Sequence, residues 1–188
     1  MSVPDQLSGG RDRSHRRVGR RTLVAASLVV VALAGADRWQ LARERAALVS
    51  CVEQGQGEVV YADRRIAATT QYASPALTGT QTPPGVRRSL RQIVQRVAGD
   101  AVAPTVAAAA ACRRPLVLPW HGVQRSARDR YATYLSGEAD RLRSGSRDLD
   151  ALSAPPASLE LSQRSALAAV LTASSGAQAD RLRALLSP

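Results

Sequence analysis

The 188-residue sequence contains no lysine, no phenylalanine and no asparagine, and it has only two isoleucines. All 26 of its basic residues are therefore arginine, a bias that codon usage in a very GC-rich genome produces. Part of the arginine excess thus has a genomic origin. Against 15 acidic residues it leaves a net charge of +11. This charge favours anionic neighbours, but it does not choose among nucleic acid, lipid headgroups and envelope polymers.

Residues that carry metal, redox and base-stacking chemistry are also scarce. The chain has two His, two Cys and one Met, and its aromatic content is 3%. Without a recognisable nucleic-acid motif, so few aromatic rings make a poor base-stacking surface. We therefore expect no catalytic residues, no cofactor, no metal site and no nucleic-acid partner. The length suits one domain of ordinary size with extensions.

The sequence has a single uniformly apolar run, residues 22–36, and no residue in it is charged. Six arginines and only two acidic residues precede it. As a helix the run would extend about 22 Å, which is less than the ~30 Å thickness of the hydrocarbon core. A membrane span at this position therefore requires Arg21 and Arg38 to snorkel, with Trp39 at the interface.

The arginine excess before this run predicts that the N-terminus is cytoplasmic and that the rest of the chain is outside. We predict a disordered basic tail over residues 1–21, a transmembrane signal-anchor over 22–40 and an extracytoplasmic domain over 41–188. The alternative is a cleaved signal peptide, because Ala32, Leu33 and Ala34 have the small-x-small form of a cleavage site. Cleavage after Ala34 would release a secreted protein. A two-helix receptor is excluded because there is no second apolar run.

Beyond residue 40, apolar residues recur at three- and four-residue steps in four blocks that Pro and Gly clusters separate. No run of alternating residues is long enough to form a sheet. We therefore predict an all-α fold in which a single N-terminal transmembrane helix precedes an up-down bundle of about four helices. The blocks cover residues 41–73, 86–111, 127–152 and 158–186.

The same periodicity predicts which residues are buried. We expect the first helix to end near Pro75, Pro104 to kink the second, and Ser158 to be the N-cap of the fourth. Glu138 lies on an apolar stripe, where we expect an ion pair with Arg141 or Arg96. The predicted stripes include Leu48, Val52, Gly55, Ala62 and Ile66, then Val86, Leu90, Ile93 and Val97, then Tyr131, Leu135 and Leu142, and finally Leu161, Val170 and Leu182.

The two cysteines are expected to form a disulfide. If the first two helices are antiparallel, Cys51 lies about 33 Å from their connection and Cys112 about 39 Å. The two side chains are then at a similar depth, within reach of each other, and an oxidising location outside the cytoplasm would allow the bond. The alternative is a pair of buried free thiols.

His121 is the one histidine outside the N-terminal tail, and it follows Trp120 in a Pro-rich connection. A lone histidine can act as a general base, but no nucleophile or orienting acid occurs at a recognisable spacing from it. We therefore favour a role in capping or loop packing. An envelope enzyme or ligand sensor with a site near His121 is the less favoured alternative.

Arginine clusters suggest a contact with an anionic surface. In up-down order, Arg113, Arg114, Arg125 and Arg128 lie at the membrane-proximal end of the bundle, where anionic headgroups are near. A second cluster at Arg87, Arg88 and Arg91 lies at the opposite end. The alternative is that the positive charge is diffuse and reflects codon usage.

These features together predict a single-pass envelope protein whose extracytoplasmic helical domain is not catalytic. It would act as an accessory or scaffold subunit, with membrane lipid and another envelope protein as partners and an oligomeric state left open. A secreted helical binding module is the alternative. The composition and single-span layout resemble those of actinobacterial envelope proteins, although no named family motif is present.

Overall fold

The computed structural model describes residues 12–114 and 117–186, and it describes the side chains of these residues except 12–26, 153 and 186. The chain divides into two units, residues 1–42 and 43–188. The described residues form helices and no strand, so the all-α prediction is confirmed. The helices are α1 (Asp12–Thr78), α2 (Pro84–Arg113), α3 (Gly122–Gly145), α4 (Asp150–Ser153), α5 (Ala157–Ala173) and α6 (Gly176–Leu186).

Helix α1 begins at Asp12, within the range predicted to be a disordered tail. Residues 12–21 are helical instead, which agrees with the good helix propensity of the arginines concentrated there. Residues 1–11 of the predicted tail lie outside the described part of the chain. None of the described helices combines the length and the apolar character that a transmembrane span needs.

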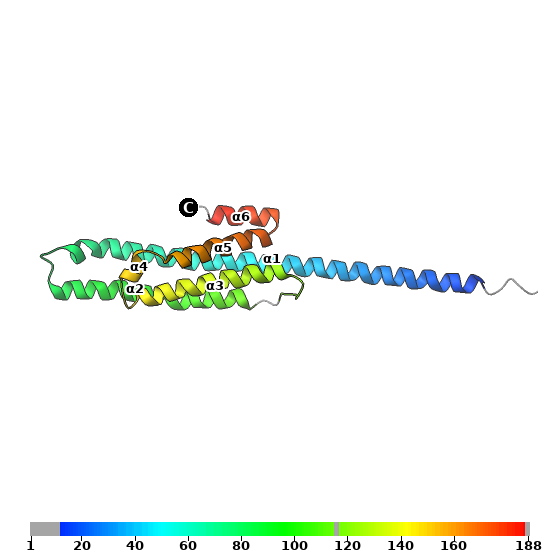
Figure 1. The fold of residues 1–188 in the computed structure, drawn as a ribbon, viewed down its shortest axis with the longest axis horizontal. Coiled ribbons are helices and arrows are strands. Elements are labelled where there is room, and N and C mark those ends of the chain that lie inside the picture. Colours follow the sequence, from blue (N-terminus) through cyan, green and yellow to red (C-terminus); the bar gives the residue numbers. More distant parts are fainter. Residues whose placement is uncertain (1–11, 115–116, 187–188) are drawn as a thin grey trace, which may run out of the picture. The chain divides into compact units, whose positions relative to one another are not determined.

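Within residues 43–188 the helices alternate in direction, as Figure 1 shows. Contacts between α1 and α3 join Glu44 to His121 and Asp63 to Arg141, so these two helices run parallel. Helix α2 runs antiparallel to both, since Cys51 of α1 meets Cys112 at the end of α2. The up-down order of the bundle therefore follows from contacts distributed along its length.

The bundle has more helices than predicted. Five of the described helices have eleven residues or more, and the single-turn α4 is a sixth. The third predicted block is interrupted after Gly145, where an added Cβ would collide with the Leu152 side chain. The chain must therefore fold back closely at this glycine. The fourth block is interrupted at Ser175, whose N–H and hydroxyl both donate to Gln178 Oε1.

Proline and serine positions account for the other differences at helix ends. Helix α1 continues past Pro75 to Thr78, and the Gly79 N–H then donates to the Pro75 carbonyl at 3.1 Å. Helix α5 has Pro156 at its N-cap, not the predicted Ser158. Proline suits a helix start because its φ is already fixed near the helical value and it has no N–H to leave unpaired.

The core confirms the apolar stripes predicted for the first and third blocks. Leu48, Val52, Ala62 and Ile66 of α1 are buried, as are Tyr131, Leu135 and Leu142 of α3. Gly55 allows these two helices to approach closely, because a Cβ at this position would lie 2.8 Å from Leu135 Cδ1. The α1–α3 contact thus depends on a residue without a side chain.

The predicted stripe of α2 is shifted by about one position in the first half of the helix. Val86 and Ile93 are 47% and 50% exposed, whereas Val94 and Ala98 are buried. Residues 107–111 are all alanine, so hydrophobicity on α2 hardly distinguishes one face from the next. The disulfide and the packing against α3 select the buried face instead. Leu161 on α5 is likewise 64% exposed, while Val170 is buried.

The predicted disulfide is present between Cys51 and Cys112, whose Cα atoms lie 5.2 Å apart. It closes a loop with a sequence separation of 61 residues and joins α1 to α2 within the main core. In the chain-entropy view such a loop stabilises the fold by about 4 kcal/mol. Many of the buried residues are alanine, so this covalent contribution supplements a modest apolar core.

We predict that oxidised protein denatured with a thiol-blocking reagent shows no free thiol until it is reduced. Replacing both cysteines by serine should lower the melting temperature without abolishing helicity, because the core of α1 and α3 remains. Mass spectrometry of the alkylated chain and thermal unfolding followed by circular dichroism measure the two effects. Two alkylated cysteines before reduction would contradict the bond and the antiparallel α1–α2 pairing that it fixes.

Candidate functional site

The connection between α2 and α3 packs over α1 near residue 44. The His121 N–H donates to the Leu118 carbonyl at 3.0 Å, and the Arg125 N–H donates to the His121 carbonyl at 3.2 Å. These two bonds form a turn that leads directly into α3, which has His121 at its N-cap.

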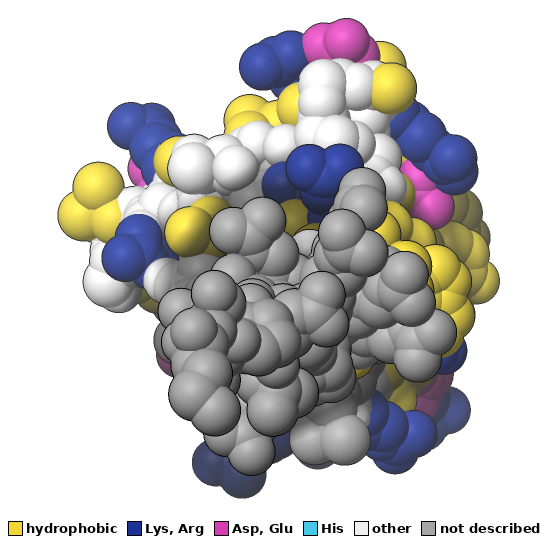
Figure 2. Space-filling view, turned by 90° about the vertical axis from the view of Figure 1, so that its right-hand side faces the viewer, with side chains coloured by type: hydrophobic (Ala, Val, Ile, Leu, Met, Phe, Trp, Pro, Cys, Tyr) yellow, Lys and Arg dark blue, Asp and Glu magenta, His cyan; other side chains and the backbone are white. Residues whose placement is uncertain are grey.

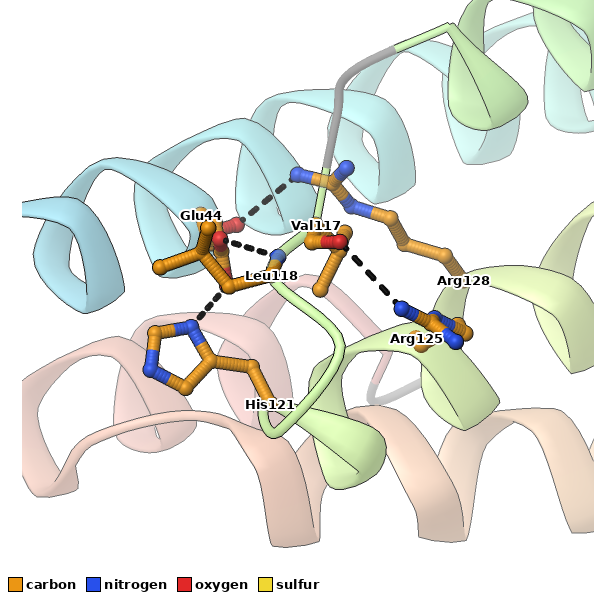
Figure 3. A network of polar contacts seen from close by, with 6 residues as sticks. All are labelled: Glu44, Val117, Leu118, His121, Arg125 and Arg128. Carbon is orange, nitrogen blue, oxygen red and sulfur yellow. Dashed lines mark hydrogen bonds and ion pairs between the residues drawn. The ribbon is translucent and has the colours of Figure 1, made fainter.

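Glu44 of α1 is the centre of this region and is only 2% exposed. Its Oε1 accepts a hydrogen bond from the Leu118 N–H at 3.0 Å, and its Oε2 lies 2.7 Å from His121 Nδ1. Figure 3 shows the carboxylate between the connection and the imidazole. One buried side chain therefore binds both a backbone amide of the connection and the residue that begins α3.

Arg128 approaches the same residue from α3. It is 3% exposed, and its Nη2 donates to the Glu44 carbonyl at 3.1 Å. Burial lowers the pKa of Arg128, while the negative charges of Glu44 and Asp129 act in the opposite direction. A guanidinium nevertheless stays protonated in proteins. We call Glu44, Leu118, His121 and Arg128 the Glu44 cluster.

Within the Glu44 cluster, the Glu44 carboxylate and the His121 imidazole resemble the carboxylate–imidazole pairs that orient catalytic histidines. Its burial favours a different use, since His121 itself is only 7% exposed. A carboxylate with a backbone donor, an imidazole and a nearby guanidinium is well satisfied in the interior. The arrangement therefore holds the connection and the start of α3 against α1, in agreement with the loop-packing role favoured for His121.

Further polar contacts follow along the α1–α3 pair. The Tyr131 hydroxyl donates to the Val52 carbonyl at 3.2 Å. Further along the pair, Arg141 donates from Nε to Glu138 Oε2 at 2.7 Å and from Nη2 to Asp63 Oδ1 at 2.6 Å. The predicted pairing of Glu138 with Arg141 is confirmed, and Asp63 is an additional partner from α1.

Arg141 is protonated and positively charged. Burial lowers the pKa of Arg141, but the hydrogen bonds and charges of Glu138 and Asp63 outweigh this effect and raise it above its ordinary value. Burial also raises the pKa of Tyr131 and of Tyr134, so both phenols are neutral at physiological pH. Both tyrosine rings lie in the core, where they do not present a stacking surface.

The arginines predicted to contact an anionic surface do not behave alike. Arg113, Arg114 and Arg125 are exposed, with Arg113 Nη2 donating to Ser136 Oγ and Arg125 Nη2 to the Val117 carbonyl, both at 3.3 Å. Arg128 is buried in the Glu44 cluster, so its assignment to a surface contact is wrong. Its place on α3 turns it toward α1, where its Nη2 reaches the Glu44 carbonyl.

Exposed arginines are not confined to one patch. Figure 2 shows dark-blue arginine side chains at several separate places on the face in view. Arg87, Arg88 and Arg91 lie in the first turns of α2, at the opposite end of that helix from Arg113. The helix rise separates Arg88 from Arg113 by roughly 37 Å, which makes the two clusters suitable for a direct comparison.

Glu44 was not among the residues predicted from the sequence, although a signal for it was present. It lies three residues after Leu41 and four before Leu48, so it continues the apolar stripe of the first block. A carboxylate on such a stripe predicts a buried polar partner. That partner lies 77 residues away in the chain, at His121, and no local pattern indicates the pairing.

No group of three or more His, Cys, Asp or Glu side chains in the described part of the chain is arranged to hold a metal ion. Comparison with known proteins finds no matching family model, no similar curated protein and no similar solved structure. The function must therefore be inferred from the residues and their arrangement.

We predict that Glu44→Ala lowers the free energy of unfolding by about 3–5 kcal/mol, because it removes one partner of a buried, charged hydrogen-bonded group. The matched control is Glu53→Ala on the same helix, since Glu53 pairs with the largely exposed Arg181 at 2.6 Å. The control should cost about 1 kcal/mol or less. Chemical denaturation followed by circular dichroism measures both values. Equal small losses in the two variants would show that the Glu44 cluster does not hold the bundle together.

Proposed function

We propose that this protein is a single-pass envelope membrane protein with a cytoplasmic N-terminus and an extracytoplasmic helical bundle that acts by contact. In this proposal residues 22–40 form the signal-anchor, and the bundle works as a scaffold or accessory subunit for another envelope protein. The exposed apolar run in the N-terminal unit is the observation that carries the proposal.

That run presents large apolar side chains to the surroundings on consecutive positions of α1. A helix places consecutive residues on different sides of its axis, so these side chains surround the helix. This part of α1 therefore has no polar face. Burying one Val or Leu side chain is worth about 1.5–3 kcal/mol. A hydrocarbon environment would therefore stabilise this segment substantially. The residues are Leu28, Val29, Val30, Val31 and Leu33, each between 57% and 69% exposed.

The disulfide supports an extracytoplasmic position for the bundle. Disulfides persist in oxidising compartments and are rare in the cytosol. The bond joins Cys51 and Cys112, both of which follow the apolar run in sequence. The arginines before the run favour a cytoplasmic N-terminus, so charge and redox chemistry agree on one orientation.

The burial of the Glu44 cluster favours contact over catalysis. Its carboxylate, imidazole and guanidinium are each less than a tenth exposed, and they bind one another or the backbone. A substrate would have to displace these bonds to reach His121. An envelope enzyme or ligand sensor with its site at His121 is therefore less well supported than an interaction module.

A secreted helical binding module is the second candidate. Ala32, Leu33 and Ala34 would permit cleavage, which would remove the exposed apolar run from the mature protein. The bundle of residues 43–188 would then be released with its disulfide and its net positive surface. The two candidates predict different mature masses and different membrane association.

One end of the bundle has the composition of a membrane-facing surface. Trp120 and Val123 are 68% and 53% exposed, and the exposed Arg125 follows them closely in the sequence. Tryptophan is favoured at membrane interfaces, and arginine attracts anionic headgroups. We include membrane lipid among the proposed partners on this basis.

We expect a reporter that is active only outside the cytoplasm to be active when it is fused after Pro188, and a cytoplasm-specific reporter to be silent. Membrane fractionation of the untagged chain separates the two candidates. A full-length band in the membrane pellet supports the anchor, whereas a soluble form starting at Gly35 supports cleavage. The opposite reporter pattern would overturn both.

We further expect the bundle (residues 40–188) to bind anionic vesicles weakly, to lose this binding above about 0.5 M salt, and to ignore neutral vesicles. Reversing the charge of Arg113, Arg114 and Arg125 together should weaken binding at least threefold, by about 0.7 kcal/mol or more. The same reversal at Arg87, Arg88 and Arg91 should leave it unchanged. Vesicle co-sedimentation measures both, and equal loss from the two sets would mean that the charge is diffuse.

A further inference from the structure

A cavity of about 650 Å³ lies between α1, α2, α3 and α4, away from the Glu44 cluster. Small-molecule sites in proteins have volumes of roughly 300–1,000 Å³, with apolar walls and a few converging polar groups. The cavity follows the last turns of α1, where its lining extends from Asp63 to Thr78. It is thus a defined space in the bundle that the proposed anchoring and scaffold role does not use.

Its walls are mainly aliphatic. Ile66 and Leu77 come from α1, Val94 from α2, and Leu149 and Leu152 from the segment around α4. These side chains are contributed by three separate parts of the chain, so the apolar wall surrounds the space on several sides. Such a wall suits an apolar ligand body, because burying aliphatic surface is favourable in proportion to its area.

The charged side chains at the cavity sum to a net negative charge. Arg141 lines it with a side chain that is 9% exposed, and its guanidinium is bound to Glu138 at 2.7 Å and to Asp63 at 2.6 Å. Glu138 alone balances the charge of Arg141. The carboxylates of Asp63 and Asp150, both of which line the cavity, therefore leave it with an excess of negative charge.

We propose that this cavity binds a small amphiphile with an apolar body and a cationic amine head. The body would lie against Ile66, Leu77 and Leu152, and the ammonium would lie at the carboxylates of Asp63 and Asp150. An ammonium donates several hydrogen bonds to carboxylate oxygens, and each contact is strengthened by charge. The proposal concerns residues 63–152 only, so it does not depend on the membrane anchor or on the partner of the bundle.

The same geometry disfavours an anionic ligand. A carboxylate head would approach a guanidinium that two acidic side chains already bind, and it would be repelled by Asp63 and Asp150. A neutral ligand would gain the apolar contacts but no charge interaction. Head-group charge is therefore the property that the cavity selects, and probes that differ only in the head test it directly.

The test compares octylammonium, octanoate and octanol, each below the concentration at which it self-associates. Binding to the purified full-length chain is measured by equilibrium dialysis in neutral-lipid nanodiscs, with empty nanodiscs as the blank, or in buffer if fractionation finds the chain soluble. We expect one octylammonium per chain, bound about tenfold tighter than either other probe. Thr70→Phe, which places a ring in the cavity lining, should abolish saturable binding of all three.

Three variants locate the head group. Asp63→Asn and Asp150→Asn should each weaken octylammonium about fivefold, as expected for a partly exposed ion pair. Asp180→Asn is the matched control: Asp180 also pairs with an arginine, Arg183, but it is 73% exposed and lies on α6. It removes the same charge and should leave the affinity unchanged. Because Asp63 also holds Arg141, the melting temperature of each variant is measured, and Asp150→Asn tests the site without that contact.

Any result other than those expected above overturns the proposal. Tighter binding of octanoate would make Arg141 an anion site, and equal binding of the three probes would mean an apolar cavity without charge selection. No saturable binding would mean that the cavity takes no ligand of this class. Loss of affinity in Asp180→Asn equal to that in Asp150→Asn would reflect net charge alone. None of these outcomes bears on the reporter and fractionation results, so the two proposals fail separately.

Discussion

The close approach of α1 and α3 at Gly55 is the contact on which the bundle depends. Tyr131 and Leu135 occupy the space that a side chain at this position would fill, and the Tyr131 hydroxyl reaches the Val52 carbonyl because the helices are so near. Helix α3 also packs against α2, α4 and α5. Its position against α1 therefore fixes the places available to the remaining helices.

Buried polar groups set the register of this contact. The Glu44 cluster lies at one end of the α1–α3 pair, and the Asp63–Arg141–Glu138 group lies further along it. Sliding one helix past the other by a single turn would separate these partners and leave charged groups unsatisfied in the interior, which is costly. Apolar packing brings the helices together, and the two polar groups select one alignment. The buried residues of α2 are small, with three alanines among them, and the Cys51–Cys112 bond links this helix covalently to α1.

The two polar groups of the α1–α3 pair differ in their accessibility to solvent. This difference favours a structural role for the first group and a binding role for the second. The Glu44 cluster is enclosed and uses its atoms for bonds within the protein. At the other group Arg141 and Asp63 face a cavity with aliphatic walls, and Asp63 is 51% exposed. Similar chemistry therefore occurs in two settings, because one set of groups is covered by the α2–α3 connection and the other borders a cavity.

The sequence by itself determined the helical class, the stripes of α1 and α3, the disulfide, and the local Glu138–Arg141 pair. For the helical class, the stripes and the ion pair, large apolar residues at helical spacing or a short separation along a helix carry the information. For the disulfide, the similar depth of the two cysteines in an antiparallel helix pair carries it. Only the tertiary structure decided the buried face of α2, since alanines make several faces nearly equivalent. It also decided the breaks after Gly145 and at Ser175, where packing and a side-chain bond override helical periodicity. The partners of Glu44, Arg128 and Asp63 come from positions more than 70 residues away. Such pairings depend on how helices align in space, and a local pattern in the sequence does not record that alignment.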